Sequence, residues 1–144
     1  MSNKVWRYRL TRAEAVVSHC LGEHIDFANE WISVHRGWIR VSERYAWDGC
    51  SPSVRVPGTR IWLGTPDGPL GSDGRPASWR ASLIHDALCQ FRMEIPGLTK
   101  ATATAVFVER LLADGAPWWM PGMYGVGVDL LGPQDFLGDP AATA

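Results

Sequence analysis

The stretch that decides the fold is Ser82-Leu83-Ile84-His85-Asp86-Ala87-Leu88-Cys89, in which a histidine and an aspartate stand side by side among apolar residues. Apolar positions around it recur at the spacing of one helix face, at Ala77, Ala81, Ile84, Ala87, Leu88 and Phe91. The spacing predicts a helix from about Pro76 to Phe91, with proline at the first helical position, where it is tolerated. Burying two titratable groups is costly unless other groups pair with them, so this helix is the first candidate for a functional site.

Two more helices are predicted after this one. Thr99 has the residue type of an N-cap, and Gly115 and Pro117 end the second helix. Its stripe has the i, i+3, i+4, i+7 spacing and contains Thr104, Phe107, Val108 and Leu111. The third helix has a stripe of Trp119, Met123, Val126 and Leu130. Gly122, Gly125 and Gly127 each weaken it by about 1 kcal/mol, so we expect this helix to depend on packing.

The first half of the chain has the pattern of strands. The run Val5-Trp6-Arg7-Tyr8-Arg9-Leu10 alternates apolar and basic side chains, as a half-buried strand does. Apolar runs at 31–35 and 38–42 flank Arg36-Gly37 and predict a hairpin with a tight turn, whose second strand is expected to continue through 45–47. Residues 11–20 fit either a helical turn or a strand.

Between the two halves, residues 50–76 are rich in proline, glycine and aspartate, which is turn chemistry. A loop of this length inside a compact domain is often functional. The sequence therefore predicts an α+β fold: an N-terminal antiparallel sheet, a long loop, and two to three packed C-terminal helices. We expect one domain over residues 1–132 and a flexible tail over 133–144.

Composition limits the classes of protein. Hydrophobic residues make up 46% of the chain, which favours a folded domain, and the formal net charge of −1 gives no general attraction to nucleic acid. No run is apolar enough to span a bilayer, and the first residues lack an apolar signal core. Cys20, Cys50 and Cys89 form no CxxC pair, which indicates free thiols in a reducing compartment.

His85 and Asp86 are the first candidates for chemistry. His85 borders the apolar stripe, whereas Asp86 lies about 100° further round the helix, so the two side chains do not face one point. The imidazole has the chemistry of a general base or metal ligand, and the carboxylate that of a ligand for a divalent cation such as calcium. The competing interpretation is structural: His85 bonds a backbone carbonyl, and Asp86 caps the helix or pairs with an arginine.

Asp48 is a second candidate cation ligand. It follows the most strand-like segment, in Asp48-Gly49-Cys50-Ser51-Pro52, and a carboxylate at a strand end is well placed to meet a helix edge. An Asp-Gly turn explains the same residues without chemistry. Cys89 stands four residues after His85 on one helix face, but helical-neighbour Cys-His dyads are not a usual catalytic layout.

Three blocks of the sequence resemble a phage and prophage family, domain of unknown function 1353 (DUF 1353). They are Tyr45-Ala46-Trp47-Asp48-Gly49-Cys50-Ser51-Pro52, then residues 81–89, and then segments of 103–132 that include Trp118-Trp119 and Val128-Asp129-Leu130-Leu131-Gly132. Together they cover roughly residues 30–132 in the family's order. The resemblance implies a phage or prophage origin and a place in the host cytoplasm or the virion.

Thr104 departs from that family, which usually has an aspartate before the phenylalanine of the second helix. A His-Asp helix that faces an Asp-bearing helix is similar in outline to secreted phospholipase A2, where the second helix supplies the carboxylate that orients the histidine. If the analogy holds, Thr104 removes the charge that would stabilise His85 as imidazolium. The departure implies a weak or inactive catalyst.

The sequence supports two functional hypotheses. The first is a phage accessory or virion-associated protein that binds other phage or host proteins, with His85 and Asp86 as a buried polar anchor. The alternative is a small metal-assisted hydrolase of lipid or cell-wall esters or amides. In that hydrolase His85 is the general base, Asp86 and Asp48 hold the cation, and Thr104 is the fourth site residue.

Overall fold

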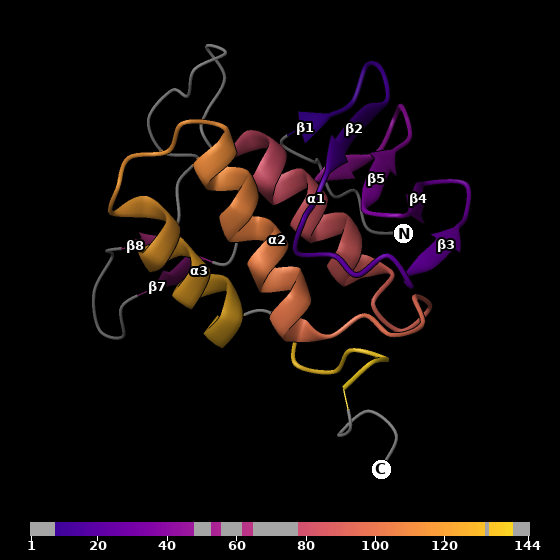
Figure 1. Cartoon of the computed structure of the whole chain (residues 1–144). Helices are drawn as coiled ribbons and strands as arrows, with labels where there is room; N and C mark the ends of the chain where they lie inside the picture. The colour runs from indigo at the N-terminus through magenta and orange to yellow at the C-terminus, as the bar shows by residue number, and fades with distance from the viewer. Residues whose placement is uncertain (1–7, 48–52, 56–61, 65–77, 132, 140–144) are drawn as a thin grey trace.

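The computed structural model describes residues 8–47, 53–55, 62–64, 78–131 and 133–139, and it confirms the α+β fold (Figure 1). Strands come first and three helices follow. The strands are β1 (Tyr8–Arg9), β2 (Glu14–Val17), β3 (Asp26–Ala28), β4 (Ile32–His35), β5 (Trp38–Val41), β6 (Ala46–Trp47), β7 (Ser53–Arg55) and β8 (Trp62–Gly64). The helices are α1 (Trp79–Gln90), α2 (Lys100–Ala113) and α3 (Met120–Leu131).

The main sheet is antiparallel and has the strand order β2-β5-β4-β3. The predicted hairpin is its centre: β4 pairs with β5 so that His35 lies opposite Trp38. Arg36 and Gly37 form the turn with positive φ angles of 46° and 82°, the backbone that a two-residue hairpin turn requires. Residues 14–17, which fit either a helix or a strand, form β2.

The expected continuation of the second hairpin strand into 45–47 is wrong. β5 ends at Val41, and Arg44 has a φ of 72°, a left-handed conformation that turns the chain away. Ala46 and Trp47 form β6, which pairs with β1 so that Trp47 lies opposite Tyr8. The predicted first strand is described only from residue 8 onward, as β1.

The helices α1 and α2 follow the sequence pattern closely. All described positions of the α1 stripe are buried, and the helix begins at Trp79, with Ser78 as its N-cap residue. Residues 76 and 77, where the predicted helix started, lie outside the described part. Thr99 caps α2: its hydroxyl accepts a hydrogen bond from the backbone N–H of Thr102 at 3.1 Å. Gly115 has a φ of 81° just beyond the end of α2, as predicted for a helix stop.

Helix α3 buries a different face from the one that carries the apolar stripe described in the sequence. The stripe picked out in the sequence is exposed, whereas the buried residues of α3 include Met120, Tyr124 and Val128. A Cβ built on Gly125 would lie 2.7 Å from Cγ2 of Val108, so this glycine lets α3 approach α2 closely. Only one residue of α3, Asp129, is charged, so apolar spacing alone does not decide which face is buried.

The elements form successive layers. Helix α1 lies between the main sheet and α2, and α2 lies between α1 and α3 (Figure 1). One buried cluster joins the sheet to α1, with Ile39, Trp47, Ile84 and Leu88 among its members. A second cluster joins α2 to α3 through Phe107, Leu111, Met120 and Tyr124.

Residues 133–139, expected from the sequence to be part of a flexible tail, contact the folded part. Phe136 is buried in the first cluster. The N–H of Leu137 donates to the carbonyl of Arg92 at 3.1 Å, and the N–H of Gly138 donates to the carbonyl of Leu98 at 2.8 Å. Residues 140–144 lie outside the described part.

Most of the predicted loop over residues 50–76 lies outside the described part, but β7 and β8 within it pair as antiparallel strands. None of the helices described is both long and apolar enough to cross a membrane.

Candidate functional site

Asp86 turns toward the sheet. The hydroxyl of Tyr45 lies 3.2 Å from Oδ2 of Asp86 and 2.8 Å from Oε1 of Gln90, and its proton can be donated to either oxygen. Burial, and then the negative charge of Asp86, raise the pKa of Tyr45, so the phenol stays protonated as a donor. Asp86 therefore joins α1 to the segment that links β5 to β6.

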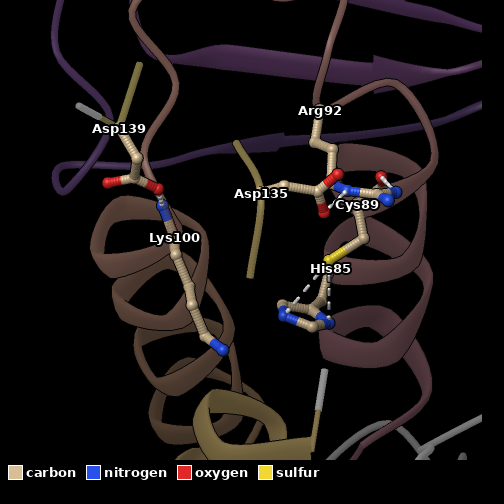
Figure 2. Close-up of polar contacts among 6 residues, drawn as sticks. All are labelled: His85, Cys89, Arg92, Lys100, Asp135 and Asp139. Carbon is tan, nitrogen blue, oxygen red and sulfur yellow. Dashed lines mark hydrogen bonds and ion pairs between the residues drawn. The ribbon is translucent and has the colours of Figure 1, made fainter. Parts of the chain in front are cut away.

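His85 turns toward α2 and lies beside Cys89 (Figure 2). The Sγ of Cys89 lies 3.5 Å from Nε2 and 3.8 Å from Nδ1 of His85, as the i, i+4 spacing allows. The ring of His85 meets the ring of Phe107 edge to face, with centroids 5.3 Å apart. The two adjacent titratable residues thus contact different neighbours, His85 on the side of α2 and Asp86 on the side of Tyr45.

The surroundings of His85 favour its neutral form. Burial, and then the positive charge of Lys100, lower the pKa of His85 from 6.5 to about 4. Burial, and then the negative charge of Asp86, raise the pKa of the Cys89 thiol to about 12, although the charges of Arg92 and Lys100 act in the opposite direction. At neutral pH the pair is an uncharged imidazole beside an uncharged thiol, which is neither a strong base nor a thiolate nucleophile.

Lys100 begins α2, and its side chain runs along that helix on the side of His85 (Figure 2). Its Nζ is buried and has no hydrogen-bond partner among the residues that the structure describes. Its backbone N–H donates to Oδ2 of Asp139 at 2.9 Å, which attaches residues 133–139 to the start of α2. Arg92 holds the same segment, with Nε 3.0 Å from Oδ1 of Asp135.

Thr104 bonds a carboxylate from α3. Its hydroxyl donates to Oδ1 of Asp129 at 3.2 Å, so an acidic group lies beside this position even though α2 does not supply it. Asp48, the other predicted cation ligand, lies outside the described residues. Of the two predicted ligands the structure therefore describes Asp86 alone, and the described residues contain no group of three or more histidine, cysteine, aspartate or glutamate side chains placed to hold a metal ion.

Trp47 of β6 and Ser82 of α1 form a second polar contact between the N-terminal strands and the first helix. The indole N–H of Trp47 donates to the hydroxyl of Ser82 at 3.1 Å, and that hydroxyl donates to the carbonyl of Trp79 at 3.0 Å. Trp47 also packs between the rings of Tyr8 and Trp79, with centroid distances of 5.2 and 5.1 Å. The indole N–H is thus satisfied by a side chain 35 residues away, and the serine hydroxyl by a backbone carbonyl one turn earlier.

Sequence reasoning missed three residues around this site: Tyr45, Lys100 and Asp129. Tyr45 and Asp129 both lie in blocks that carry the family resemblance, and each provides a polar partner for a predicted site residue. One feature of the sequence could have drawn attention to Lys100. It is the only lysine after the first few residues, and it opens a predicted helix.

The second notable feature is an exposed apolar face on α3. Trp119, Met123, Val126 and Leu130 are 40%, 64%, 58% and 69% exposed, and we call these four residues the α3 outer stripe. Trp118, just before the helix, is 91% exposed. Beside α3, on the outer side of α2, lies a shallow apolar groove that is wide open to solvent, lined by Cys20, Ala105, Val108, Glu109, Leu112 and Ala113.

Comparison of the chain with models of protein families, with curated proteins and with solved structures finds no match. The resemblance to the phage family therefore stays a prediction from the three blocks of sequence.

Proposed function

We propose that this chain is an accessory or virion-associated protein of a phage or prophage, and that it acts by binding another macromolecule through the outer face of α3. In this proposal His85 and Asp86 form a polar anchor inside the protein. The sequence blocks support the phage origin. The α3 outer stripe supports the binding role, and it is the observation that carries the proposal.

The stripe supports binding because of its extent. Its residues fall within roughly 60° of the helix circumference, at i, i+4, i+7 and i+11, so they form one continuous ridge. Large exposed apolar patches on folded proteins mark interaction sites, and tryptophan is enriched among the residues that contribute most binding energy. Trp118 and Trp119 stand together at the start of this ridge.

The contacts of His85 and Asp86 support the anchor role. Asp86 accepts from a protonated tyrosine, and His85 packs on Phe107 with a pKa of about 4. A general base is most effective when its pKa lies near the working pH, so His85 is poorly suited to that task at neutral pH. The hydrolase alternative, with Asp86 and Asp48 as cation ligands, stays a prediction that calcium or zinc titration by calorimetry tests.

Complementation in the phage or prophage that encodes the chain tests the proposal. Particle yield is measured after the gene is deleted and replaced by variants. Met123→Lys, on the stripe, is expected to abolish complementation, because a charge there cannot be buried against a partner. His85→Gln is expected to retain it. Met93→Lys is the matched control, because Met93 is exposed in the segment between α1 and α2, away from the stripe.

The proposal fails if His85→Gln abolishes particle yield while Met123→Lys does not. Each variant is first shown by circular dichroism to fold, so that loss of yield is not loss of structure. A His85-dependent yield together with metal binding near one cation per chain would instead favour the hydrolase.

A further inference from the structure

We propose that the partner of the α3 outer stripe is a second copy of this chain, with the stripe of each copy seated in the α2 groove of the other. This inference rests on the proposed function and names the occupant of the same surface. The groove adjoins the helix that carries the stripe, because Val108 lines the groove and also packs on α3 at Gly125.

The stripe and the groove are complementary in shape. The α3 outer stripe is a ridge of large apolar side chains, and the groove beside it is lined mostly by small and medium apolar ones. Between them lies Gly122, where an added Cβ would meet no atom within 4 Å. A ridge next to a groove on one surface is self-complementary under a twofold axis, since each copy then offers both halves of two identical contacts.

The exposed apolar area matches one half of a dimer interface. Six side chains expose roughly 700 Å² on this face, given their exposed fractions and the size of such side chains. They are the four stripe residues, Trp118 and Leu112. A standard protein interface buries about 800 Å² on each partner. The apolar surface on this face is therefore about what one half of a stable dimer needs.

The charges of the stripe and the groove also favour a second copy over a membrane. Glu109 is the only charged residue that lines the groove, and Asp129 is the only one in α3. Asp129 accepts from Thr104 at the contact with α2, so the stripe itself is uncharged and the groove carries one acidic residue. Stripe and groove offer no cation to an anionic lipid surface, whereas interfacial membrane helices usually carry lysine or arginine. An uncharged ridge and a nearly uncharged groove fit each other better than either fits a lipid headgroup layer.

Analytical ultracentrifugation of the full chain tests the proposal. The wild type is expected to show twice the monomer mass at about 100 µM and to dissociate on dilution, as a micromolar affinity requires. Met123→Lys on the stripe and Leu112→Glu in the groove are each expected to weaken the dimer by at least about tenfold. Met93→Lys, away from the face, is expected to leave it unchanged.

Mixing the two variants gives the sharpest result. In a heterodimer of Met123→Lys with Leu112→Glu, one stripe-groove contact is intact and the other places a lysine opposite a glutamate. The mixture is therefore expected to dimerise more strongly than either variant alone. A mixture that dimerises no better than the separate variants contradicts the seating of each stripe in the groove of the other copy.

Three further outcomes overturn the inference. These are a wild type that stays monomeric at every concentration, a dimer that both variants leave intact, and a monomer that binds phosphatidylcholine-phosphatidylglycerol vesicles in a Met123-dependent way. If the wild type is monomeric but Met123→Lys still abolishes particle yield, only the second-copy inference fails. If neither mass nor yield responds to Met123→Lys, the proposed function fails with it.

Discussion

The imidazole of His85 packs on Phe107 and lies beside Cys89, and it is held in its neutral form. Its pKa in the folded chain is about 4, below the ordinary 6.5, so the unfolded chain binds more protons between these pH values. Stability from this group is therefore complete above pH 6.5 and is lost as pH falls toward 4. We expect the free energy of unfolding to be about 2 kcal/mol lower at pH 5 than at pH 7, measured by urea denaturation.

Three variants test whether His85 causes this pH dependence of the free energy of unfolding. His85→Gln removes the titrating group and is expected to flatten the change between pH 7 and 5, whereas His35→Gln, at an exposed position beside Asp26, is expected to keep it. Lys100→Met removes the second cause of the shift and is expected to raise the pKa of His85 in an NMR titration. An unchanged pH dependence in His85→Gln contradicts the placement of the ring.

The helix α3 offers a test at the scale of an element, because two of its glycines face different surroundings. Gly125→Ala puts a Cβ 2.7 Å from Cγ2 of Val108, and valine in a helix has little rotamer freedom to move away. We expect a loss of about 1–3 kcal/mol in the free energy of unfolding. Gly122→Ala meets no atom within 4 Å and is expected to gain up to about 1 kcal/mol, because alanine favours the helix.

Thermal unfolding of both variants measures the difference. If Gly125→Ala is as stable as Gly122→Ala, then α3 does not pack on α2 through Gly125, and the assignment of its inner and outer faces is contradicted. The pair is matched in chemistry, since each variant adds one methyl group to the same helix.

The sequence alone predicted those elements for which the apolar pattern allows only one arrangement of the backbone. The hairpin around Arg36-Gly37, the cap at Thr99 and the stop at Gly115 each combine an apolar pattern with a residue that fixes the backbone. In α3 the apolar residues cover both faces, so the pattern does not choose between them. The choice is made by a close contact at Gly125, which is a property of the packed structure.

The candidate site was predicted only in part, because local spacing fixes the direction of a side chain but not its partners. Helical spacing correctly indicated that His85 and Asp86 point in different directions. Their partners come from distant segments: Tyr45 lies 41 residues from Asp86 in the chain, and Asp129 lies 25 residues from Thr104. Local spacing carries no information about such contacts, because they depend on how the sheet and helices stack.

At the scale of the whole molecule, the layers explain why one apolar face is left open. The main sheet, α1, α2 and α3 follow one another, so α1 and α2 each have a neighbour on both sides (Figure 1). Helix α3 packs its inner face on α2, and its outer face carries the stripe that the proposed function uses. The central claim is therefore that this outer face is open to solvent in the monomer.

Methionine oxidation tests that claim most directly, because Met120 and Met123 lie one turn apart on the two faces of α3. Met123 is 64% exposed and Met120 is fully buried, while Met93, at 44%, is an internal reference for an exposed methionine. Folded protein at about 10 nM, well below a micromolar dissociation constant and therefore monomeric, is treated briefly with hydrogen peroxide and analysed by mass spectrometry. We predict that Met123 is oxidised as fast as Met93 and roughly tenfold faster than Met120. Equal rates for Met120 and Met123, or a protected Met123 beside a reactive Met120, would contradict the account.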